Sequence, residues 1–362
     1  MSARPVMIMA GGTGGHVYPA LAVAKALEAN SQDVFWRGTR TGLEGRVVPA
    51  NDIDIEWVSI KGLRQKGVVA LIVAPLQLAW ALLQSLNAIR RRRPAVVLGM
   101  GGFVSGPGGL AAWLTRRPLV IHEQNATSGL TNRLLARFAR VVLQAFPGSF
   151  TAEVNAETVG NPVRPDIAQL APPAERYRDR NGPLQLLVLG GSQGALALNQ
   201  LVPAALARLP AESRPKVRHQ CGERTRATAE AAYRDSDIDV ELVEFIEDMA
   251  SAYAWADAVV CRAGALTVAE IAAAGLPAVF VPFPAAVDDH QTANALGLTE
   301  AGAAITVQER DIDDVALARL LGEFLTNRDD LLERAECARS LAVPDSLATI
   351  TERCLELVRV RT

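Results

Sequence analysis

The sequence has few of the residues that crosslink small secreted folds or hold metal ions. Its four cysteines, Cys221, Cys261, Cys337 and Cys354, lie far apart and form no C-x-x-C pair. This spacing argues against a disulfide framework and a zinc site, and it favours a reducing compartment. We also expect no signal peptide, because the N-terminus leads directly into an apolar segment typical of a strand.

Two common nucleotide-binding patterns are missing. No G-x-x-x-x-G-K-[ST] motif occurs, which excludes a P-loop kinase or ATPase. The first glycine loop lacks G-x-G-x-x-G spacing, since the last position counted from Gly12 is Val17. The second expected strand ends in Arg37-Gly38-Thr39, without the acidic residue that a nicotinamide ribose needs. A dehydrogenase is therefore a weak alternative.

Asp-x-Asp strings, which often mark metal sites, do not follow apolar strand segments here. They occur at Asp52/Asp54, Asp235/Asp237/Asp239 and Asp311/Asp313. We interpret them as solvated turns and predict no metal ligands.

The sequence has one long apolar run, Val68–Leu86, which is near the length of a membrane span. Three residues interrupt it: Pro75, Gln77 and Gln84. We therefore reject a spanning helix and keep two alternatives, a core helix and an apolar helix lying on a membrane surface. Basic residues flank the run and favour the second alternative: Lys61, Arg64 and Lys66 before it and Arg90–Arg93 after it.

The net charge of −2 conceals an asymmetry along the chain. Residues 1–160 hold 17 Lys and Arg against 9 Asp and Glu, a net of +8, whereas the remainder holds 20 and 30, a net of −10. The two halves are therefore expected to have different partners. A basic surface suits nucleic acid and an anionic membrane equally well.

Strand and helix signals alternate along the chain and predict a parallel, doubly wound α/β fold. The strands expected in the first half are Val6–Ala10, Val34–Trp36, Ile55–Val58, Ala95–Leu98, Leu119–Ile121 and Val141–Leu143. Those expected in the second half are Leu184–Leu189, Val217–His219, Val240–Phe245, Ala258–Cys261 and Ala278–Val281.

The break between these halves lies at Asn161–Pro165, which carries two prolines and has the composition of an interdomain linker. A last helix near Asp345–Val360 has no strand after it, so we expect it to return to the first domain. The predicted domains are 1–160 with about 345–362, and 161–344. Ligands bind at the carboxyl ends of parallel strands, so we expect two similar units with a site in a cleft where they face each other.

The chain is organised around Gly11-Gly12-Thr13-Gly14-Gly15-His16, between the first strand and a helix. Glycines allow close ligand approach there, and free N–H groups at the helix start attract anions. An imidazole at this position is a candidate general base. The alternative is a packing turn with an incidental histidine.

Polar or glycine-rich segments also follow other expected strands. They are Gly101–Gly109, His122-Glu123-Gln124-Asn125, Arg262–Glu270 and Asp288–Asn294. The segment His122–Asn125 suits a pocket better than a surface loop. In the segment Arg262–Glu270, the N-terminus of the expected helix can hold a phosphate, and Glu270 can accept hydrogen bonds from two ribose hydroxyls. An ordinary surface glutamate is the alternative for Glu270.

With these motifs in order, the chain resembles the MurG family of GT-B glycosyltransferases, which act in bacterial cell-wall synthesis. The shared motifs are GGTGGH at 11–16, GGFVSGPGG at 101–109, HEQN at 122–125, GNPVR at 160–164, GGSQG at 190–194, RAGALTVAE at 262–270 and the loop through Gln291. The resemblance implies inverting transfer of N-acetylglucosamine from UDP-GlcNAc to the C4 hydroxyl of the muramyl sugar of lipid I, giving lipid II. It also implies no required metal or other cofactor.

The resemblance also implies roles for individual residues. It makes His16 the general base and places Thr13, Gly14, Gly15 and Asn125 against substrate in the cleft. It gives the nucleotide sugar the following contacts: Arg164, Ser192, Ile246, Ala265, Leu266, Thr267, Val268, Ala269, Glu270 and Gln291. It assigns no role to His122, Glu123 or His290.

The implied location is the cytoplasmic face of the plasma membrane, as a peripheral protein bound to an anionic surface. Nucleic acid is then not a partner, and other cell-wall enzymes are candidate partners. The family's apolar patch often has more aromatics than this chain, in which Trp80 and Trp113 are the nearest bulky residues. Two rivals remain, a UDP-GlcNAc epimerase of similar fold and a non-catalytic nucleotide-sugar-binding scaffold at the membrane.

Overall fold

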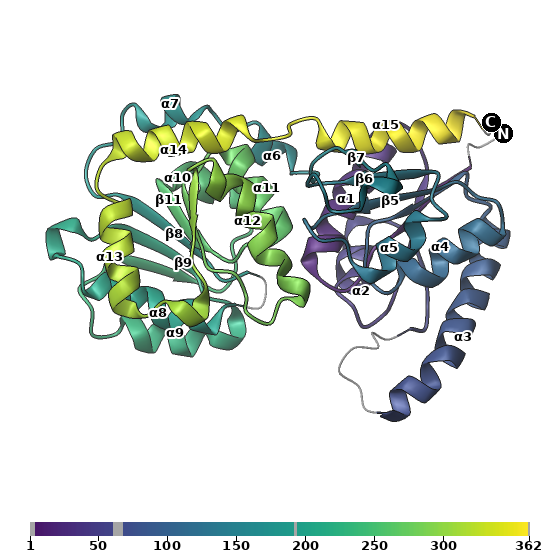
Figure 1. The fold of residues 1–362 in the computed structure, drawn as a ribbon, viewed down its shortest axis with the longest axis horizontal. Helices are drawn as coiled ribbons and strands as arrows, with labels where there is room; N and C mark the ends of the chain where they lie inside the picture. Colours follow the sequence, from purple (N-terminus) through teal and green to yellow (C-terminus); the bar gives the residue numbers. More distant parts are fainter. Residues whose placement is uncertain (1–3, 61–67, 192–193, 361–362) are drawn as a thin grey trace. The chain divides into compact units, whose positions relative to one another are not determined.

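The structure of the chain is a computed structural model that describes residues 4–60, 68–191 and 194–360 (Figure 1). Lys61, Arg64, Lys66 and Ser192, which figure in the sequence analysis, lie outside the described residues. The chain divides into two compact units. The first unit combines Met1–Pro162 with Asp345–Thr362, and the second is Val163–Pro344.

A seven-stranded parallel sheet forms the centre of the first unit, in the order β3-β2-β1-β4-β5-β6-β7. Its strands are β1 (Val6–Met9), β2 (Val34–Gly38), β3 (Ile55–Trp57), β4 (Val96–Gly99), β5 (Leu119–Glu123), β6 (Val141–Gln144) and β7 (Glu157–Thr158). The sequence predicted all of these except β7, whose two residues are too few to show a pattern. Strand order reverses at β1, which pairs with both β2 and β4, as in a doubly wound sheet.

Helices cover both faces of this sheet, because alternate strand residues point to opposite sides. Val6 and Ile8 join the core under α1 (Gly14–Ala29) and α15 (Ser346–Arg359). Met7 and Met9 pack instead on the side of α3 (Val68–Arg92), α4 (Ser105–Leu114) and α5 (Leu130–Ala136). The prediction that the last helix returns to the first unit is confirmed, since α15 lies against α1 (Figure 1).

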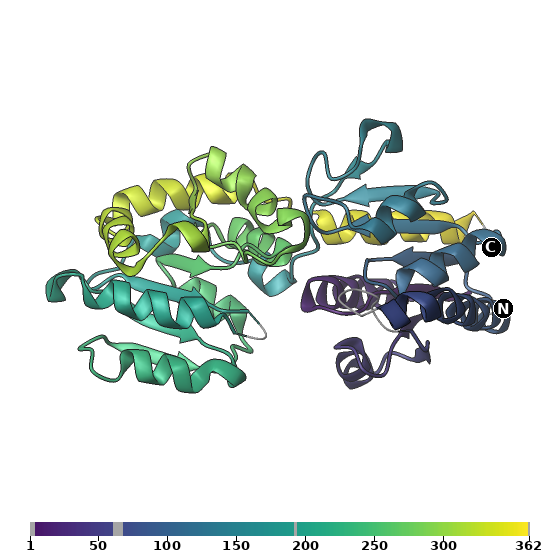
Figure 2. The same ribbon diagram turned by 60° about the horizontal axis from the view of Figure 1, so that its bottom comes forward.

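The second unit repeats the plan of a sheet with helices on both faces (Figure 2). Its six parallel strands have the order β10-β9-β8-β11-β12-β13. They are β8 (Gln185–Leu189), β9 (Lys216–Gln220), β10 (Val240–Val243), β11 (Ala258–Cys261), β12 (Ala278–Phe280) and β13 (Ala304–Thr306). Only β13 was not expected, because its three residues carry a single large apolar side chain. The predicted fold class, two Rossmann-like units with a returning C-terminal helix, is confirmed.

The helices of the second unit vary in length, and the first two are short. They are α6 (Pro165–Ala168), α7 (Pro173–Tyr177), α8 (Leu196–Ala207), α9 (Arg226–Tyr233), α10 (Met249–Trp255), α11 (Ala265–Ala274), α12 (His290–Glu300), α13 (Asp314–Phe324) and α14 (Arg328–Ser340). Short helices such as α7 depend on tertiary contacts for their stability.

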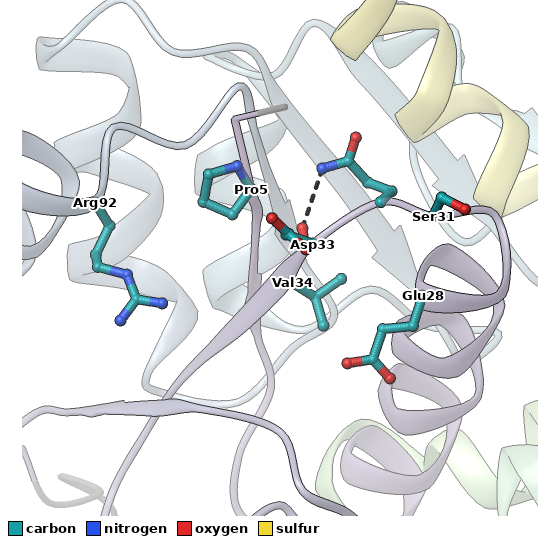
Figure 3. Close-up of a pocket in the computed structure, with 7 residues that line it drawn as sticks. Pro5, Glu28, Ser31, Asp33, Val34 and Arg92 are labelled. Carbon is teal, nitrogen blue, oxygen red and sulfur yellow. Dashed lines mark hydrogen bonds between the residues drawn. The ribbon is translucent and has the colours of Figure 1, made fainter. Parts of the chain in front are cut away.

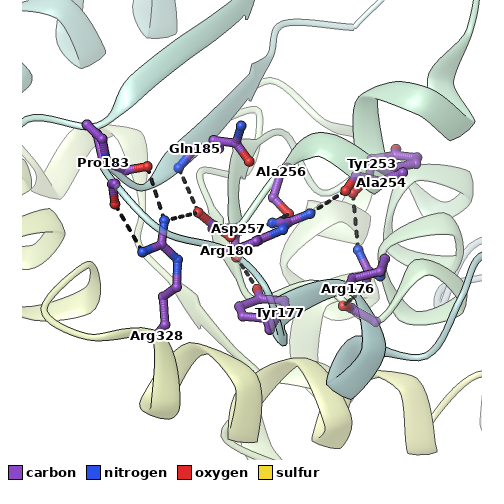
Figure 4. A network of polar contacts seen from close by, with 12 residues as sticks. Arg176, Tyr177, Arg180, Pro183, Gln185, Tyr253, Ala254, Ala256, Asp257 and Arg328 are labelled. Carbon is purple, nitrogen blue, oxygen red and sulfur yellow. Dashed lines mark hydrogen bonds and ion pairs between the residues drawn. The ribbon is translucent and has the colours of Figure 1, made fainter.

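A buried carboxylate at the amino end of β11 supplies such contacts (Figure 4). Asp257 pairs with Arg180, which follows α7, and with Arg328 of α14 at 3.4 Å. It also accepts a hydrogen bond of 2.9 Å from the backbone N–H of Gln185. The carboxylate is thus paired on several sides, as a charge inside a protein must be. It ties α7 and α14 to the edge of the sheet opposite the carboxyl ends.

Candidate functional site

The glycine loop after β1 brings His16 to the carboxyl edge of the first sheet. Thr13 is the exposed N-cap of α1, and the exposed Gly15 and half-buried Gly14 follow it. His16 lies in the first turn of the helix, where its N–H donates to the carbonyl of Thr13 at 3.1 Å. This geometry leaves N–H groups at the start of α1 for an anionic ligand.

A second glycine loop, after β4, makes room for the imidazole. Gly101 has a φ of +95°, and a Cβ atom there would lie 2.6 Å from Nδ1 of His16. At Gly102 a Cβ atom would lie 2.3 Å from the carbonyl oxygen of Gly11. The two loops therefore approach so closely that neither position has space for a side chain.

Glu44 is a buried carboxylate that holds the first glycine loop from the other side. It accepts hydrogen bonds from the N–H of Gly12 at 3.2 Å and from the N–H and hydroxyl of Thr39 at 3.0 and 2.6 Å. The glycine loop is thereby fixed to the segment that follows β2. Sequence analysis did not single out Glu44, because an isolated glutamate in a polar segment gives no signal.

The polar segment at the end of β5 faces inward, so the surface-loop alternative for it is wrong. His122 is fully buried, and its Nε2 lies 2.9 Å from the carbonyl oxygen of Gly160. Gln124, also buried, lies with its Nε2 2.9 Å from Nδ1 of His122 and its Oε1 2.6 Å from Nδ1 of His16. Burial lowers the pKa of His122 to about 4, so its imidazole is neutral.

Glu123 turns away from this chain of contacts and organises the following loop. Its carboxylate accepts from the backbone N–H of Asn125 at 3.0 Å and from the Asn125 side chain at 3.2 Å. It also accepts from the N–H of Gly129 at 3.1 Å and from the side chain of Asn132 at 2.9 Å. Glu123 thus positions Asn125, the residue for which the resemblance implies substrate contact.

In the second unit, the predicted site residues gather where β11 gives way to α11. Gly264 caps the helix, and the first two turns hold Ala265, Leu266, Thr267, Val268, Ala269 and Glu270. The N-cap residue is a glycine and has no side chain to cap this N-terminus, and the N-terminus of a helix attracts anions.

Glu270 is buried in α11, so the surface alternative for it is wrong. The hydroxyl of Tyr253 donates to its Oε2 at 3.0 Å, and Arg164 lies 3.5 Å from its Oε1. Burial raises the pKa of Glu270, and the positive charge of Arg164 opposes that shift. The structure thus brings Arg164 and Glu270 together, although 106 positions separate them. Tyr253 is the partner that sequence analysis missed.

The remaining predicted residues of this unit lie at neighbouring strand ends. Half-buried Ile246 follows β10. Gln291 lies in the first turn of α12, and its Oε1 accepts from the N–H of Phe283, which follows β12, at 2.9 Å. Asn294 connects the same helix to the end of β11 by donating to the carbonyl of Ala263 at 3.1 Å.

The second unit also contains a histidine that serves packing. His219 is buried, with Tyr233 and Asn199 each 3.0 Å from one of its ring nitrogens. Its lowered pKa, about 4, comes from burial. Across the described ranges of the chain, no group of three or more His, Cys, Asp or Glu could hold a metal ion.

A separate pocket of about 470 Å³ lies at the opposite edge of the first sheet (Figure 3). Its lining combines residues around the starts of β1 and β2 with the ends of α1 and α3: Pro5, Glu28, Ser31, Gln32, Asp33, Val34 and Arg92. Ligands of parallel α/β folds bind at the carboxyl ends of strands, so this pocket is not the candidate site.

Comparison with known proteins places the whole chain in one family. Residues 6–144 match the glycosyltransferase family 28 N-terminal domain, and residues 185–350 match the glycosyltransferase family 28 C-terminal domain. A relative from Alkalilimnicola ehrlichii is 56% identical over 98% of this chain and 99% of its own length. One from Nitrosococcus oceani is 54% identical over 97% and 98%. Both are named UDP-N-acetylglucosamine–N-acetylmuramyl-(pentapeptide) pyrophosphoryl-undecaprenol N-acetylglucosamine transferase.

Among solved structures, the crystal structure of Acinetobacter baumannii MurG superimposes with a TM-score of 0.85 at 41% identity. The match covers 98% of this chain and 99% of that one.

The neutral, buried His122 predicts a pH dependence of stability. Below pH 6.5, His122 becomes protonated in the unfolded chain, whereas in the folded protein it stays neutral until about pH 4. The free energy of unfolding therefore falls as the pH drops from 6.5 to 4. In His122→Gln the slope should be smaller than in the wild type by about 1.4 kcal/mol per pH unit. Urea unfolding at several pH values measures it. His290→Gln is the control, and a wild-type slope in His122→Gln would contradict the assignment.

Proposed function

The chain belongs to glycosyltransferase family 28, and from that premise we propose how it carries out its reaction. It is an N-acetylglucosaminyltransferase that uses UDP-GlcNAc as donor and lipid I, the undecaprenyl-pyrophosphoryl-MurNAc-pentapeptide, as acceptor. The product is lipid II, a precursor of peptidoglycan. Its relatives' full-length similarity and their printed names support this assignment over a UDP-GlcNAc epimerase or a non-catalytic scaffold.

In the proposed step, His16 of the first unit activates the acceptor. The C4 hydroxyl of the muramyl sugar is a weak nucleophile, so its proton must leave as the new bond forms. His16 takes this proton while the hydroxyl oxygen bonds to C1 of N-acetylglucosamine and the bond from C1 to the diphosphate oxygen breaks. UDP leaves with that electron pair, and attack from the opposite face inverts C1. The observation that carries this role is the fixed imidazole at the glycine loop.

The second unit binds the donor in this proposal. The N-terminus of α11, with its positive helix-dipole end, stabilises the diphosphate, on which negative charge develops as UDP leaves. Glu270 accepts hydrogen bonds from the ribose hydroxyls, since a carboxylate has about four acceptor sites, of which Tyr253 occupies one and Arg164 faces another. Arg164, Ser192, Ile246 and Gln291 complete the contacts with the nucleotide sugar, and no metal takes part.

The first unit provides the membrane-facing surface, and helix α3 supports this. Ala74, Ala81 and Ala88 are buried on one side of the helix. On the other side Leu76 is 72% exposed to solvent, and Trp80 and Leu83 are each 57% exposed. Spacings of four and three residues place these exposed side chains on one stripe. No helix within the described parts of the chain has the length and apolarity to cross a bilayer.

A groove and an aromatic pair extend this apolar surface. Leu76 and Trp80 also line a groove of about 560 Å³ with Trp57 and Ile60, at the ends of β2 and β3. Trp113 of α4, itself half-exposed, contacts Phe138 with ring centroids 4.9 Å apart and ring planes tilted by 47°.

The basic flank of α3 supports the membrane role only in part. Arg91 and Arg92 form ion pairs with Glu56 and Asp54 inside the unit, each at 2.5 Å. Arg90 and Arg93 are exposed at the same end of the helix. We propose peripheral binding to the anionic cytoplasmic face of the plasma membrane, through an apolar stripe with basic residues beside it. Nucleic acid is not a partner, and other cell-wall enzymes can gather at the same surface.

Replacing the proposed base tests the chemistry. His16→Ala should lower kcat by about 10²–10⁴-fold, because the acceptor hydroxyl keeps its proton, with little change in affinity for UDP-GlcNAc. A radiolabelled-donor assay with a lipid I analogue measures kcat, and calorimetry measures donor affinity. His290→Ala is the matched control. Unchanged kcat in His16→Ala would remove His16 as the base.

Replacing the proposed ribose acceptor tests donor binding. Glu270→Ala should weaken UDP-GlcNAc binding by roughly 10-fold or more, the cost of losing hydrogen bonds to a charged acceptor. Titration calorimetry with UDP-GlcNAc measures it, with Glu323→Ala on an exposed helix face of the same unit as control. Because Glu270 is buried, thermal unfolding must show that the variant is folded at the assay temperature. Equal affinity in a folded Glu270→Ala protein would refute the ribose role.

A charge on the exposed stripe tests membrane binding. Leu76→Glu should reduce binding to phosphatidylglycerol vesicles by on the order of tenfold, since burying a leucine side chain in an apolar phase contributes about 1.5–3 kcal/mol. Vesicle flotation at two salt concentrations measures binding, and Leu341→Glu, an exposed leucine of the second unit, is the control. Binding that responds neither to lipid charge nor to Leu76→Glu would reject the surface.

A further inference from the structure

We propose that Gln124, oriented by His122, fixes the neutral His16 imidazole in the tautomer with hydrogen on Nδ1, so that Nε2 is the proton-accepting atom. Both residues act through His16, so they are positioning residues. The proposal deepens the proposed function, because it rests on His16 being the base.

The backbone carbonyl of Gly160 determines where the hydrogen lies on His122. The carbonyl oxygen of Gly160 can only accept, and it lies 2.9 Å from Nε2 of His122. Nε2 of His122 therefore carries hydrogen. Since burial keeps this imidazole neutral, its Nδ1 has a lone pair and needs a donor.

The side chain of Gln124 supplies that donor, and its amide can then point only one way. Its NH₂ group lies 2.9 Å from Nδ1 of His122 and 3.0 Å from the carbonyl oxygen of the same residue. Both amide hydrogens are thus used on acceptors. Exchanging the amide oxygen and nitrogen would set an oxygen against two acceptors, so the amide oxygen must face His16.

The amide oxygen determines the state of His16. It lies 2.6 Å from Nδ1 of His16, and an amide oxygen can only accept, so Nδ1 carries the hydrogen. The other neutral tautomer would set two lone pairs against each other. Nε2 is then the bare nitrogen, and among the described residues none forms a hydrogen bond with it. Free imidazole in water favours the opposite tautomer, so the protein selects the one in which Nε2 is basic.

Several features hold the hydrogen-bonded series of His122, Gln124 and His16 in place. Gln124 is buried, and its backbone carbonyl oxygen accepts a hydrogen bond of 3.0 Å from the side-chain amide of Asn161. Gly101 leaves no side chain that could push the His16 ring away. When Nε2 takes a proton, the imidazolium keeps its Nδ1 hydrogen bond to Gln124, so nothing has to rearrange during the reaction.

A glutamine is the suitable partner because it is neutral. A carboxylate at this place would favour the charged imidazolium, which cannot accept a proton. The charged groups nearby are directed elsewhere: Glu123 binds the Asn125 loop, and Glu44 binds Gly12 and Thr39. The neighbouring His122 is neutral. Gln124 thus fixes the direction of the imidazole without adding charge beside it.

Nitrogen NMR of histidine-labelled protein tests the proposal directly. The chain has four histidines, and His16→Ala identifies the His16 signals. In the neutral wild type, His16 should show hydrogen on Nδ1 and a bare Nε2. A wild-type His16 with hydrogen on Nε2 overturns the proposal, and this measurement requires no folded variant of Gln124.

Variants of Gln124 test the consequence. Gln124→Met should shift His16 toward the Nε2-protonated tautomer and lower kcat by about two- to tenfold, the worth of one hydrogen bond, with KM for UDP-GlcNAc unchanged. Gln124→Glu should restore the Nδ1 hydrogen bond and move the acid limb of the kcat–pH profile to higher pH. Gln144→Met, the same change at the end of β6, is the control. An unchanged tautomer in Gln124→Met contradicts the proposal.

Failure of the proposed function gives a different result. If His16→Ala retains full kcat while the wild-type tautomer is the one stated and Gln124→Met alters it, His16 is not the base but Gln124 still orients it. If His16→Ala loses activity and Gln124→Met leaves the tautomer unchanged, the base stands and the positioning role of Gln124 fails.

Discussion

The need of a buried imidazole for two hydrogen-bond partners organises the carboxyl edge of the sheet in the first unit. His122 has no access to water, so each of its ring nitrogens must find a partner in the protein. Gly160 satisfies one nitrogen and Gln124 the other, and Gln124 then reaches His16. One continuous chain of contacts thereby joins the end of β5, the segment after β7 and the glycine loop after β1. Leaving any member unsatisfied would cost the full desolvation of a polar group, which makes the arrangement specific.

The same edge depends on parallel topology and on glycine. Carboxyl ends of parallel strands meet at one edge, so residues far apart in sequence become neighbours there. Gly101 and Gly102 let two loops approach at distances that a Cβ atom would prevent. In the second unit, the packing of α6 and α10 against α11 brings Arg164 and Tyr253 to Glu270. The candidate site residues of each unit therefore lie near the carboxyl edge of its sheet, while contacts such as those of Asp257 hold the opposite edge of the second sheet.

Much of the fold follows from local pattern, and so does part of the site. Short apolar segments separated by helical stretches predicted eleven of the thirteen strands found in the described residues, and the strandless C-terminal segment predicted the return of α15. β7 and β13 were missed because two or three residues show no period. His16 and Glu270 attracted attention through their positions after glycine-rich strand ends. Gln124 was noticed only as part of the polar segment 122–125, and Glu44 gave no signal, since their individual roles depend on partners that sequence proximity does not reveal.

The sequence by itself determined the two parallel α/β units, the strand ends that carry polar residues and the family to which the ordered motifs belong. These follow from hydrophobic period, glycine placement and motif order, all of which are local or linear properties of a chain. Only the tertiary structure decided that Glu270 is buried beside Tyr253, that Glu123 serves its own loop, and that the side-chain amide of Gln124 faces Nδ1 of His16. Burial and hydrogen-bond direction are set by neighbours from distant segments, and those neighbours exist only once the chain has folded.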